Sequence, residues 1–157
     1  MTTIACRRDL DDRYVICADS WEIVESEDGG ATVELCEKLF RKSILVDRKQ
    51  VEIIIATAGE SGAGMAFVDW YGKPGEPPDL RDTEFDVLIL RPDGLFKADQ
   101  FCRPVKVLED YTAIGTGRKH ALTAMDCGLS AVEAVMLAAR RDPYTGGTIV
   151  SMSLSKE

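Results

Sequence analysis

The chain begins Met1-Thr2-Thr3, and its second residue carries the groups needed for nucleophilic chemistry. Initiator methionine is usually removed when the next residue is as small as threonine, and loss of Met1 would leave Thr2 with a free α-amine. Such an amine has a pKa of about 7.7–8 and can accept a proton near neutral pH. Nucleophile and base would then belong to one residue, as in the Thr-N-terminus variant of covalent catalysis. Most processed N-terminal threonines are ordinary termini, so this prediction depends on partners from elsewhere in the chain.

Segments that could supply these partners resemble the proteasome β-subunit family, which includes its bacterial relative HslV, and they occur in the family's order. The most specific segment reads Arg-Asp-Pro-Tyr-Thr-Gly-Gly and is very close to the family's Arg-Asp-x-Tyr-Ser-Gly-Gly. The matching segments are Thr2–Ile4 with the hairpin that ends at Ala18-Asp19, the lysine-bearing Glu37–Phe40, Ala58-Gly59, Ala113–Gly117 and Arg141–Gly147.

The resemblance implies a role for each matching residue. Thr2 is implied as the nucleophile, with its own amine as the proton acceptor. Lys38 is implied beside the Thr2 hydroxyl, where its cation favours the deprotonated form of both groups. Asp19 is implied to hold Lys38 through a charge-assisted hydrogen bond. The backbone N–H of Gly59 is implied as an oxyanion donor, and losing one such donor typically costs about 3–4 kcal/mol in barrier.

A second group of matching residues is implied to surround the Thr2 amine. Thr116, Asp142 and Thr145 form this polar cradle, and Gly146 fits beside it because a close backbone approach tolerates no side chain. Taken singly, the two threonines could be turn residues that bond to nearby backbone. An aspartate and a lysine taken at random could likewise form an exposed ion pair of little energetic consequence.

The sequence leaves open two alternatives to catalysis by Thr2. Gly59-Glu60-Ser61-Gly62-Ala63 follows a predicted strand and is close to the Gly-x-Ser-x-Gly nucleophile elbow of serine hydrolases. Ser61, Asp86 and His120 occur in the chain order of that mechanism, although His120 begins a predicted helix. The other alternative is a catalytically inactive, proteasome-like structural subunit that retains Met1. Substitution of His120 distinguishes the two enzymes, and the intact mass distinguishes an enzyme from a scaffold.

The candidate site residues must be held in place by strands and helices. The pattern of apolar and turn residues in the sequence predicts where these elements lie. Strands and helices come in blocks, which is typical of helices layered over antiparallel sheets. We predict one domain, residues 1–157, and the resemblance implies an α+β fold, a four-layer αββα sandwich of the N-terminal nucleophile hydrolase class. The predicted strands are Thr3–Cys6, Tyr14–Ala18, Lys38–Ile44, Val51–Ala56, Phe85–Leu90, Leu95–Lys97, Tyr111–Gly115 and Thr148–Leu154. The predicted helices are Met65–Trp70, Arg118–Cys127 and one that Ser130 caps and that ends near Arg141, and Ser26–Gly30 and Gly72–Pro78 are predicted loops.

Composition limits the partners and cofactors. The 157 residues include 19 basic and 27 acidic ones, and the formal charge of −8 argues against nucleic acid as a partner. No apolar run approaches the ~18 residues that cross a bilayer, and the N-terminus shows no basic and apolar leader, so we expect no membrane and a cytoplasmic location. Five cysteines without a Cys-x-x-Cys pair and a single histidine do not match a structural zinc site. We therefore expect no metal or organic cofactor.

The function that the resemblance implies is a threonine-type endopeptidase that acts on peptides or proteins through an acyl-enzyme intermediate. It also implies identical subunits in stacked rings, with the sites facing an inner chamber, and the HslV likeness implies an ATP-dependent unfoldase as partner. An amidohydrolase for a small substrate would use the same nucleophile and stays open. The apolar side chains of Phe67 and Trp70 could serve either the core or contacts between subunits.

Overall fold

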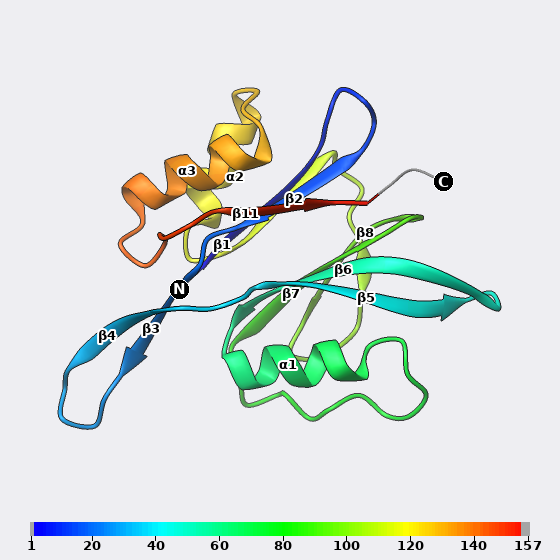
Figure 1. Ribbon diagram of the computed structural model, residues 1–157, viewed down its shortest axis with the longest axis horizontal. Helices are drawn as coiled ribbons and strands as arrows, with labels where there is room; N and C mark the ends of the chain where they lie inside the picture. Colours follow the sequence, from blue (N-terminus) through cyan, green and yellow to red (C-terminus); the bar gives the residue numbers. More distant parts are fainter. Residues whose placement is uncertain (1, 155–157) are drawn as a thin grey trace.

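The computed structural model describes residues 2–154, which form two large sheets, a separate two-stranded ribbon and three helices (Figure 1). The predicted removal of Met1 lies outside these residues. The elements are β1 (Thr3–Arg8), β2 (Tyr14–Ala18), β3 (Trp21–Glu25), β4 (Ala31–Leu35), β5 (Leu39–Val46), β6 (Lys49–Gly59), α1 (Ser61–Trp70), β7 (Phe85–Arg91), β8 (Gly94–Asp99), β9 (Val105–Lys106), β10 (Tyr111–Gly115), α2 (Arg118–Asp126), α3 (Ala131–Arg141) and β11 (Val150–Ser153).

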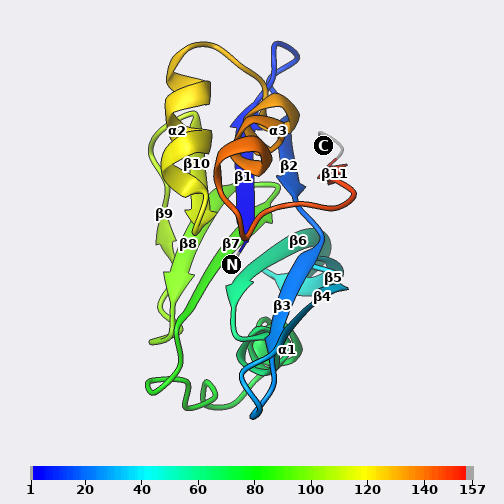
Figure 2. The same ribbon diagram turned by 90° about the vertical axis from the view of Figure 1, so that its left-hand side faces the viewer.

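The two large sheets lie face to face between helical layers. The first sheet has the strand order β10-β1-β2-β11 and the second β5-β6-β7-β8-β9, and all neighbouring strands are antiparallel. Figures 1 and 2 both place α2 and α3 outside the first sheet and α1 outside the second. The layers are those of the αββα sandwich, so the predicted fold is confirmed.

Successive side chains of a strand point to opposite faces of its sheet. They form three apolar layers: one between the two sheets, one under α1, and one under α2 and α3. On β1, Ile4 packs between the two sheets, whereas Ala5 packs against α2 and α3. On β6, Ile54 lies between the sheets, whereas Ile53 and Ile55 pack on the side of α1. The unbroken isoleucine run of β6 therefore belongs to a strand that is covered on both faces. Full burial of each such side chain contributes about 1.5–3 kcal/mol.

Helix α1 covers the second sheet and begins earlier than predicted. Its first residue is Ser61 rather than Met65, and the preceding Glu60 makes no side-chain capping bond, so the sequence carried no start signal there. Phe67 is fully buried against the second sheet, and Trp70 packs at the edge of the same cluster. Phe67 thus belongs to the core rather than to a subunit contact.

The ends of the other two helices follow the sequence signals closely. Ser130 and Glu133 form a reciprocal capping box at the start of α3, as predicted. Gly128 follows α2 with a φ of +90°, a conformation that favours glycine just beyond a helix. No helix within residues 2–154 combines the length and the hydropathy needed to cross a bilayer.

The ribbon of β3 and β4 is missing from the sequence prediction, as is the two-residue strand β9. The turn of the ribbon coincides with the predicted loop Ser26–Gly30, but the sequence predicts no strand on either side. Every residue of β4 is exposed, so the strand has no buried face that alternation could reveal. The ribbon projects from the sandwich at the lower left of Figure 1. Its first residues, Trp21 and Glu22, lie beside the candidate site.

Candidate active site

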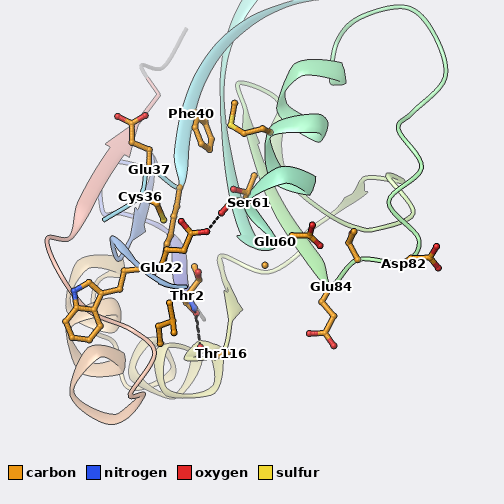
Figure 3. A pocket seen from close by; sticks show the side chains of 17 residues that line it. Thr2, Glu22, Cys36, Glu37, Phe40, Glu60, Ser61, Asp82, Glu84 and Thr116 are labelled. Carbon is orange, nitrogen blue, oxygen red and sulfur yellow. Dashed lines mark hydrogen bonds between the residues drawn. The ribbon is translucent and has the colours of Figure 1, made fainter. Parts of the chain in front are cut away.

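Thr2 directly precedes β1 and lines a cavity (Figure 3). Its main-chain nitrogen donates a hydrogen bond to Thr116 Oγ1 at 3.2 Å, across a separation of 114 residues in the chain. The N–H of Gly117 donates to the Thr2 carbonyl at 3.3 Å. The pairing of β1 with β10 sets this register, because it puts Thr3 opposite Gly115. Only 4% of Thr2 is exposed, so the start of the described chain is anchored at the turn after β10.

Asp19 and Lys38 form a buried ion pair. Lys38 Nζ donates to Asp19 Oδ1 at 2.8 Å, and the two side chains are 5% and 0% exposed. Lys38 Nζ also donates to the carbonyl of Trp21 at 2.6 Å. Asp19 accepts two further bonds, from the N–H of Thr3 at 3.0 Å and from the N–H of Gly146 at 3.0 Å. The carboxylate at the end of β2 thereby fixes both the lysine before β5 and the start of β1.

Asp142, at the end of α3, organises a chain of hydroxyl groups. Thr116 Oγ1 and Thr145 Oγ1 each donate to Asp142 Oδ2 at 2.6 Å. Thr3 Oγ1 lies 2.7 Å from Thr145 Oγ1 and extends the chain. Burial would raise the pKa of the Asp142 carboxyl, but hydrogen bonds from Thr116, Thr145 and the N–H of Tyr144 favour the ionised form, and the pKa is lowered. The carboxylate is thus held ionised one hydroxyl away from the Thr2 nitrogen.

Gly146 lies where the chain passes against the first residue of the ribbon. A Cβ at this position would lie 2.6 Å from the ring of Trp21, a separation that real Cβ atoms do not tolerate. The carbonyl of Gly146 accepts a bond from the N–H of Ser20 at 3.0 Å. The close approach expected at Gly146 is therefore to Trp21 and Asp19 rather than to Thr2 itself.

Gly59 ends β6 and has a φ of +114°, which L side chains rarely adopt. A Cβ there would lie 2.2 Å from the carbonyl oxygen of Glu84, so glycine is required on both counts. The turn at Gly59 brings the start of α1 to the cavity that Thr2 lines.

The cavity has a volume of about 760 Å³. That size is typical of ligand-binding clefts, which commonly enclose ~300–1,000 Å³. The candidate residues divide into those on its wall and those that support the wall through the hydrogen bonds above. Thr2, Lys38, Gly59 and Thr116 line the cavity, whereas Asp19, Asp142, Thr145 and Gly146 do not.

Glu22, in β3, and Cys36, directly after β4, also line the cavity. Neither residue was predicted from the sequence. The Glu22 carboxylate accepts a hydrogen bond from the Ser61 hydroxyl, so it joins the ribbon to the start of α1 (Figure 3). Burial raises the pKa of the Cys36 thiol, although the nearby Lys38 cation opposes this shift. A protonated thiol is a weak nucleophile. The sequence offered no signal for either residue, because the ribbon itself was not predicted.

The residues of the serine-hydrolase alternative are not brought together. Ser61 lies at the start of α1, outside the second sheet, whereas His120 is exposed on α2, outside the first sheet (Figures 1 and 2). The partner of the Ser61 hydroxyl is Glu22 instead. A triad needs its base in hydrogen-bond contact with the nucleophile, and the layered fold separates the two. Among residues 2–154, no group of three or more His, Cys, Asp or Glu side chains is placed to hold a metal ion.

Comparison with solved structures identifies the fold. Eukaryotic HslV from Trypanosoma brucei superposes with a TM-score of 0.71 at 17% sequence identity, covering 98% of this chain and 99% of that one. BPH of Thiobacillus denitrificans in complex with epoxomicin gives a TM-score of 0.69 at 22% identity, covering 99% of both chains. A second BPH structure gives 0.67 at 20% identity, with 99% and 98% covered. The chain has an HslV-type fold.

The resemblance stated from the sequence is thus confirmed at the level of the fold. Neither a family model nor a curated protein matches this sequence. Identities of 17–22% establish the HslV-type fold alone. Any assignment of chemistry to this chain therefore depends on its own residues and their geometry.

Proposed function

We propose that the domain formed by residues 1–157 is a threonine-type endopeptidase, in which Thr2 is the nucleophile after Met1 is removed. The observation that carries the proposal is the position of Thr2 on a cavity wall, with its nitrogen bonded to Thr116 and with buried Lys38 on the same wall. A buried ion pair is a poor way to stabilise a fold, because desolvation offsets most of its attraction. The Asp19–Lys38 pair is therefore better explained by chemistry than by stability.

In the proposed reaction, the Thr2 hydroxyl attacks the carbonyl carbon of a peptide bond and passes its proton to the Thr2 α-amine. The tetrahedral intermediate then collapses, the C–N bond breaks, and the departing nitrogen takes that proton. The acyl group is left on Thr2 as an ester. Water attacks this ester, the acid product leaves, and the hydroxyl is restored. The sequence of steps needs no metal and no organic cofactor.

The neighbouring residues have distinct proposed roles. The Lys38 cation favours the deprotonated hydroxyl and the neutral amine of Thr2, and Asp19 positions that cation. The backbone N–H of Gly59 donates to the oxyanion, and an interaction of this kind lowers a barrier by about 3–4 kcal/mol. Thr116 connects the Thr2 nitrogen to Asp142, which orients the amine.

The likeness to HslV supports a further proposal about assembly. Identical subunits form stacked rings whose sites face an inner chamber, and an ATP-dependent unfoldase supplies protein substrates. Confinement of this kind keeps an endopeptidase from attacking folded proteins at random.

The proposal is tested by hydrolysis of fluorogenic peptides, together with the intact mass of the purified protein. We expect the mass to lack Met1, Thr2→Ala to abolish hydrolysis, Thr2→Ser to retain part of it, and Thr32→Ala, an exposed threonine on β4, to leave it unchanged. Epoxomicin, which is bound in the BPH complex, is expected to inhibit the wild-type protein. Undiminished hydrolysis by Thr2→Ala would refute the mechanism. Loss in His120→Ala instead would favour the serine hydrolase, and retained Met1 without activity would favour the inactive subunit.

A further inference from the structure

The cavity over Thr2 has an unusually acidic wall. Its carboxylates outnumber its cations by five to one, whereas the whole chain has 27 acidic and 19 basic residues. The one cation, Lys38, is buried and paired with Asp19, so its charge is already compensated. The acidic residues on the wall are Glu22, Glu37, Glu60, Asp82 and Glu84.

These carboxylates come from separate parts of the chain. Glu22 belongs to β3 and Glu37 follows β4, whereas Glu60 precedes α1 and the other two precede β7. Figure 3 shows Glu22 between Thr2 and Ser61, with Glu60, Asp82 and Glu84 on the opposite side. Among the ion pairs that join residues 2–154, none includes any of the five. No ion pair within the described residues therefore neutralises these five charges, although Glu22 also accepts the hydrogen bond from Ser61.

Glu22 has a second feature that favours a cationic ligand. It lies directly opposite Glu34 in the pairing of β3 with β4. Like charges directly opposite each other in a two-stranded ribbon repel and destabilise it. A cation bound near Glu22 would relieve this repulsion, so the ribbon itself favours a positively charged occupant.

The rest of the wall suits a long side chain better than a small ion. Ile23, Phe40 and Met65 give the cavity an apolar surface alongside its carboxylates. Arginine and lysine bury their methylene stems on apolar surface while the charged head remains in a polar environment. A metal ion would need several of these carboxylates around one point, and residues 2–154 contain no such group.

We infer that this cavity selects peptide substrates with an arginine or lysine side chain next to the bond that is cleaved. The methylene stem lies along the apolar wall, and the cationic head is received by Glu22 together with the other carboxylates of the wall. This inference rests on the proposed function, because it assigns a substrate class to the same site.

The first test measures binding and does not need catalysis. Two fluorescent peptides that differ only in arginine against norleucine at the residue before the cleaved bond are titrated into the Thr2→Ala variant and followed by anisotropy. We expect at least roughly tenfold tighter binding of the arginine peptide, the size expected for one charge-assisted hydrogen bond. The difference should shrink in high salt, because exposed charges are screened.

Charge-neutral variants locate the selectivity. Glu22→Gln and, separately, Glu84→Gln should each reduce the preference for arginine by several-fold, whereas the norleucine peptide should bind unchanged. Glu25→Gln is the matched control. Glu25 is an exposed residue of β3, three positions after Glu22 and therefore on the opposite face of the ribbon, and it does not line the cavity. Equal binding of the two peptides, or an equal loss in the Glu25 control, would overturn the inference.

Hydrolysis by the wild-type protein separates this inference from the proposed function. Cleavage after arginine and lysine in preference to norleucine supports both. Cleavage that prefers norleucine overturns the selectivity and leaves the peptidase intact. Tight binding of the arginine peptide with no cleavage of either overturns the peptidase and retains the cationic site.

Discussion

At the scale of single residues, the Asp19–Lys38 ion pair of the site is buried on both sides. Each partner compensates the other, and Asp19 also receives main-chain N–H groups from Thr3 and Gly146. Removal of one charge leaves the other buried without its counterion. The pair thereby makes the geometry near Thr2 sensitive to either residue.

We predict that Lys38→Met and Asp19→Asn each lower the free energy of unfolding by about 3–5 kcal/mol. The double variant should lose clearly less than the sum of the two, since it leaves no lone buried charge. Urea denaturation followed by circular dichroism measures all three. Lys49→Met, at an exposed position on β6, is the control and should change stability by less than about 0.5 kcal/mol. Strictly additive losses in the double variant would contradict this account of the pair.

The second prediction concerns Asp142, whose pKa is lowered in the folded protein. A carboxyl with a depressed folded-state pKa stabilises the fold above its unfolded-state value of about 3.9, and this contribution disappears as the pH falls through the lower folded value. Asp142→Asn has no such contribution to lose. Its urea midpoint should therefore fall less than that of the wild type between about pH 6 and about pH 3. Parallel pH profiles for the two proteins would show that Asp142 is not stabilised as an anion.

The sequence predicted those site residues that lie in the matched segments, such as Asp142 and Thr116, because each segment has a distinctive local pattern. It could not predict Glu22, which has no motif of its own. Nor could it show that Gly146 approaches Trp21, because a contact between distant segments leaves no mark on either of them alone.

At the scale of elements, the ribbon of β3 and β4 connects the supporting residues to the cavity. Trp21 begins the ribbon, packs on Gly146 and offers its carbonyl to Lys38. The ribbon thus sets the position of the lysine from one side, while Asp19 sets it from the other. The ribbon escaped prediction because its second strand is wholly exposed, and α1 was predicted to begin too late because Glu60 forms no side-chain cap.

We therefore predict that Gly146→Ala displaces Trp21 and with it the contact to Lys38. A shift of about 1 Å near a reacting group can lower kcat about a hundredfold. The measurement is kcat for a fluorogenic peptide, alongside the urea midpoint. Gly62→Ala is the control, because a Cβ at that position in α1 meets nothing within 4 Å. Full activity in Gly146→Ala would show that the packing of Trp21 does not position the lysine.

At the scale of the whole molecule, the sandwich explains how residues from both ends of the chain meet at Thr2. The first sheet brings β1 beside β10, and α3 delivers Asp142 to the same edge. The layered fold could be predicted because the five segments occur in order, at the boundaries of elements whose alternation is clear. Subunit contacts could not be predicted, because an apolar residue such as Phe67 has the same signature in a core as in an interface.

The proposed rings make a prediction for the intact protein in solution. Light scattering coupled to size-exclusion chromatography should give a mass that is a large multiple of the 17.3 kDa chain. Thr2→Ala should give the same mass, because Thr2 takes part in chemistry rather than in assembly. A monomer at micromolar concentration would contradict the proposal of stacked rings. It would not contradict the proposed reaction.

The central claim, that Thr2 carries the acyl group, is tested most directly by trapping that intermediate. The protein is mixed with an activated peptide ester, quenched in acid within the first turnover and examined by intact and fragment mass spectrometry. We expect a mass increase equal to one acyl group, located on an N-terminal Thr2 and absent from Thr2→Ala. An acyl group on Ser61, or rapid hydrolysis with no acylated protein at any time, would contradict it.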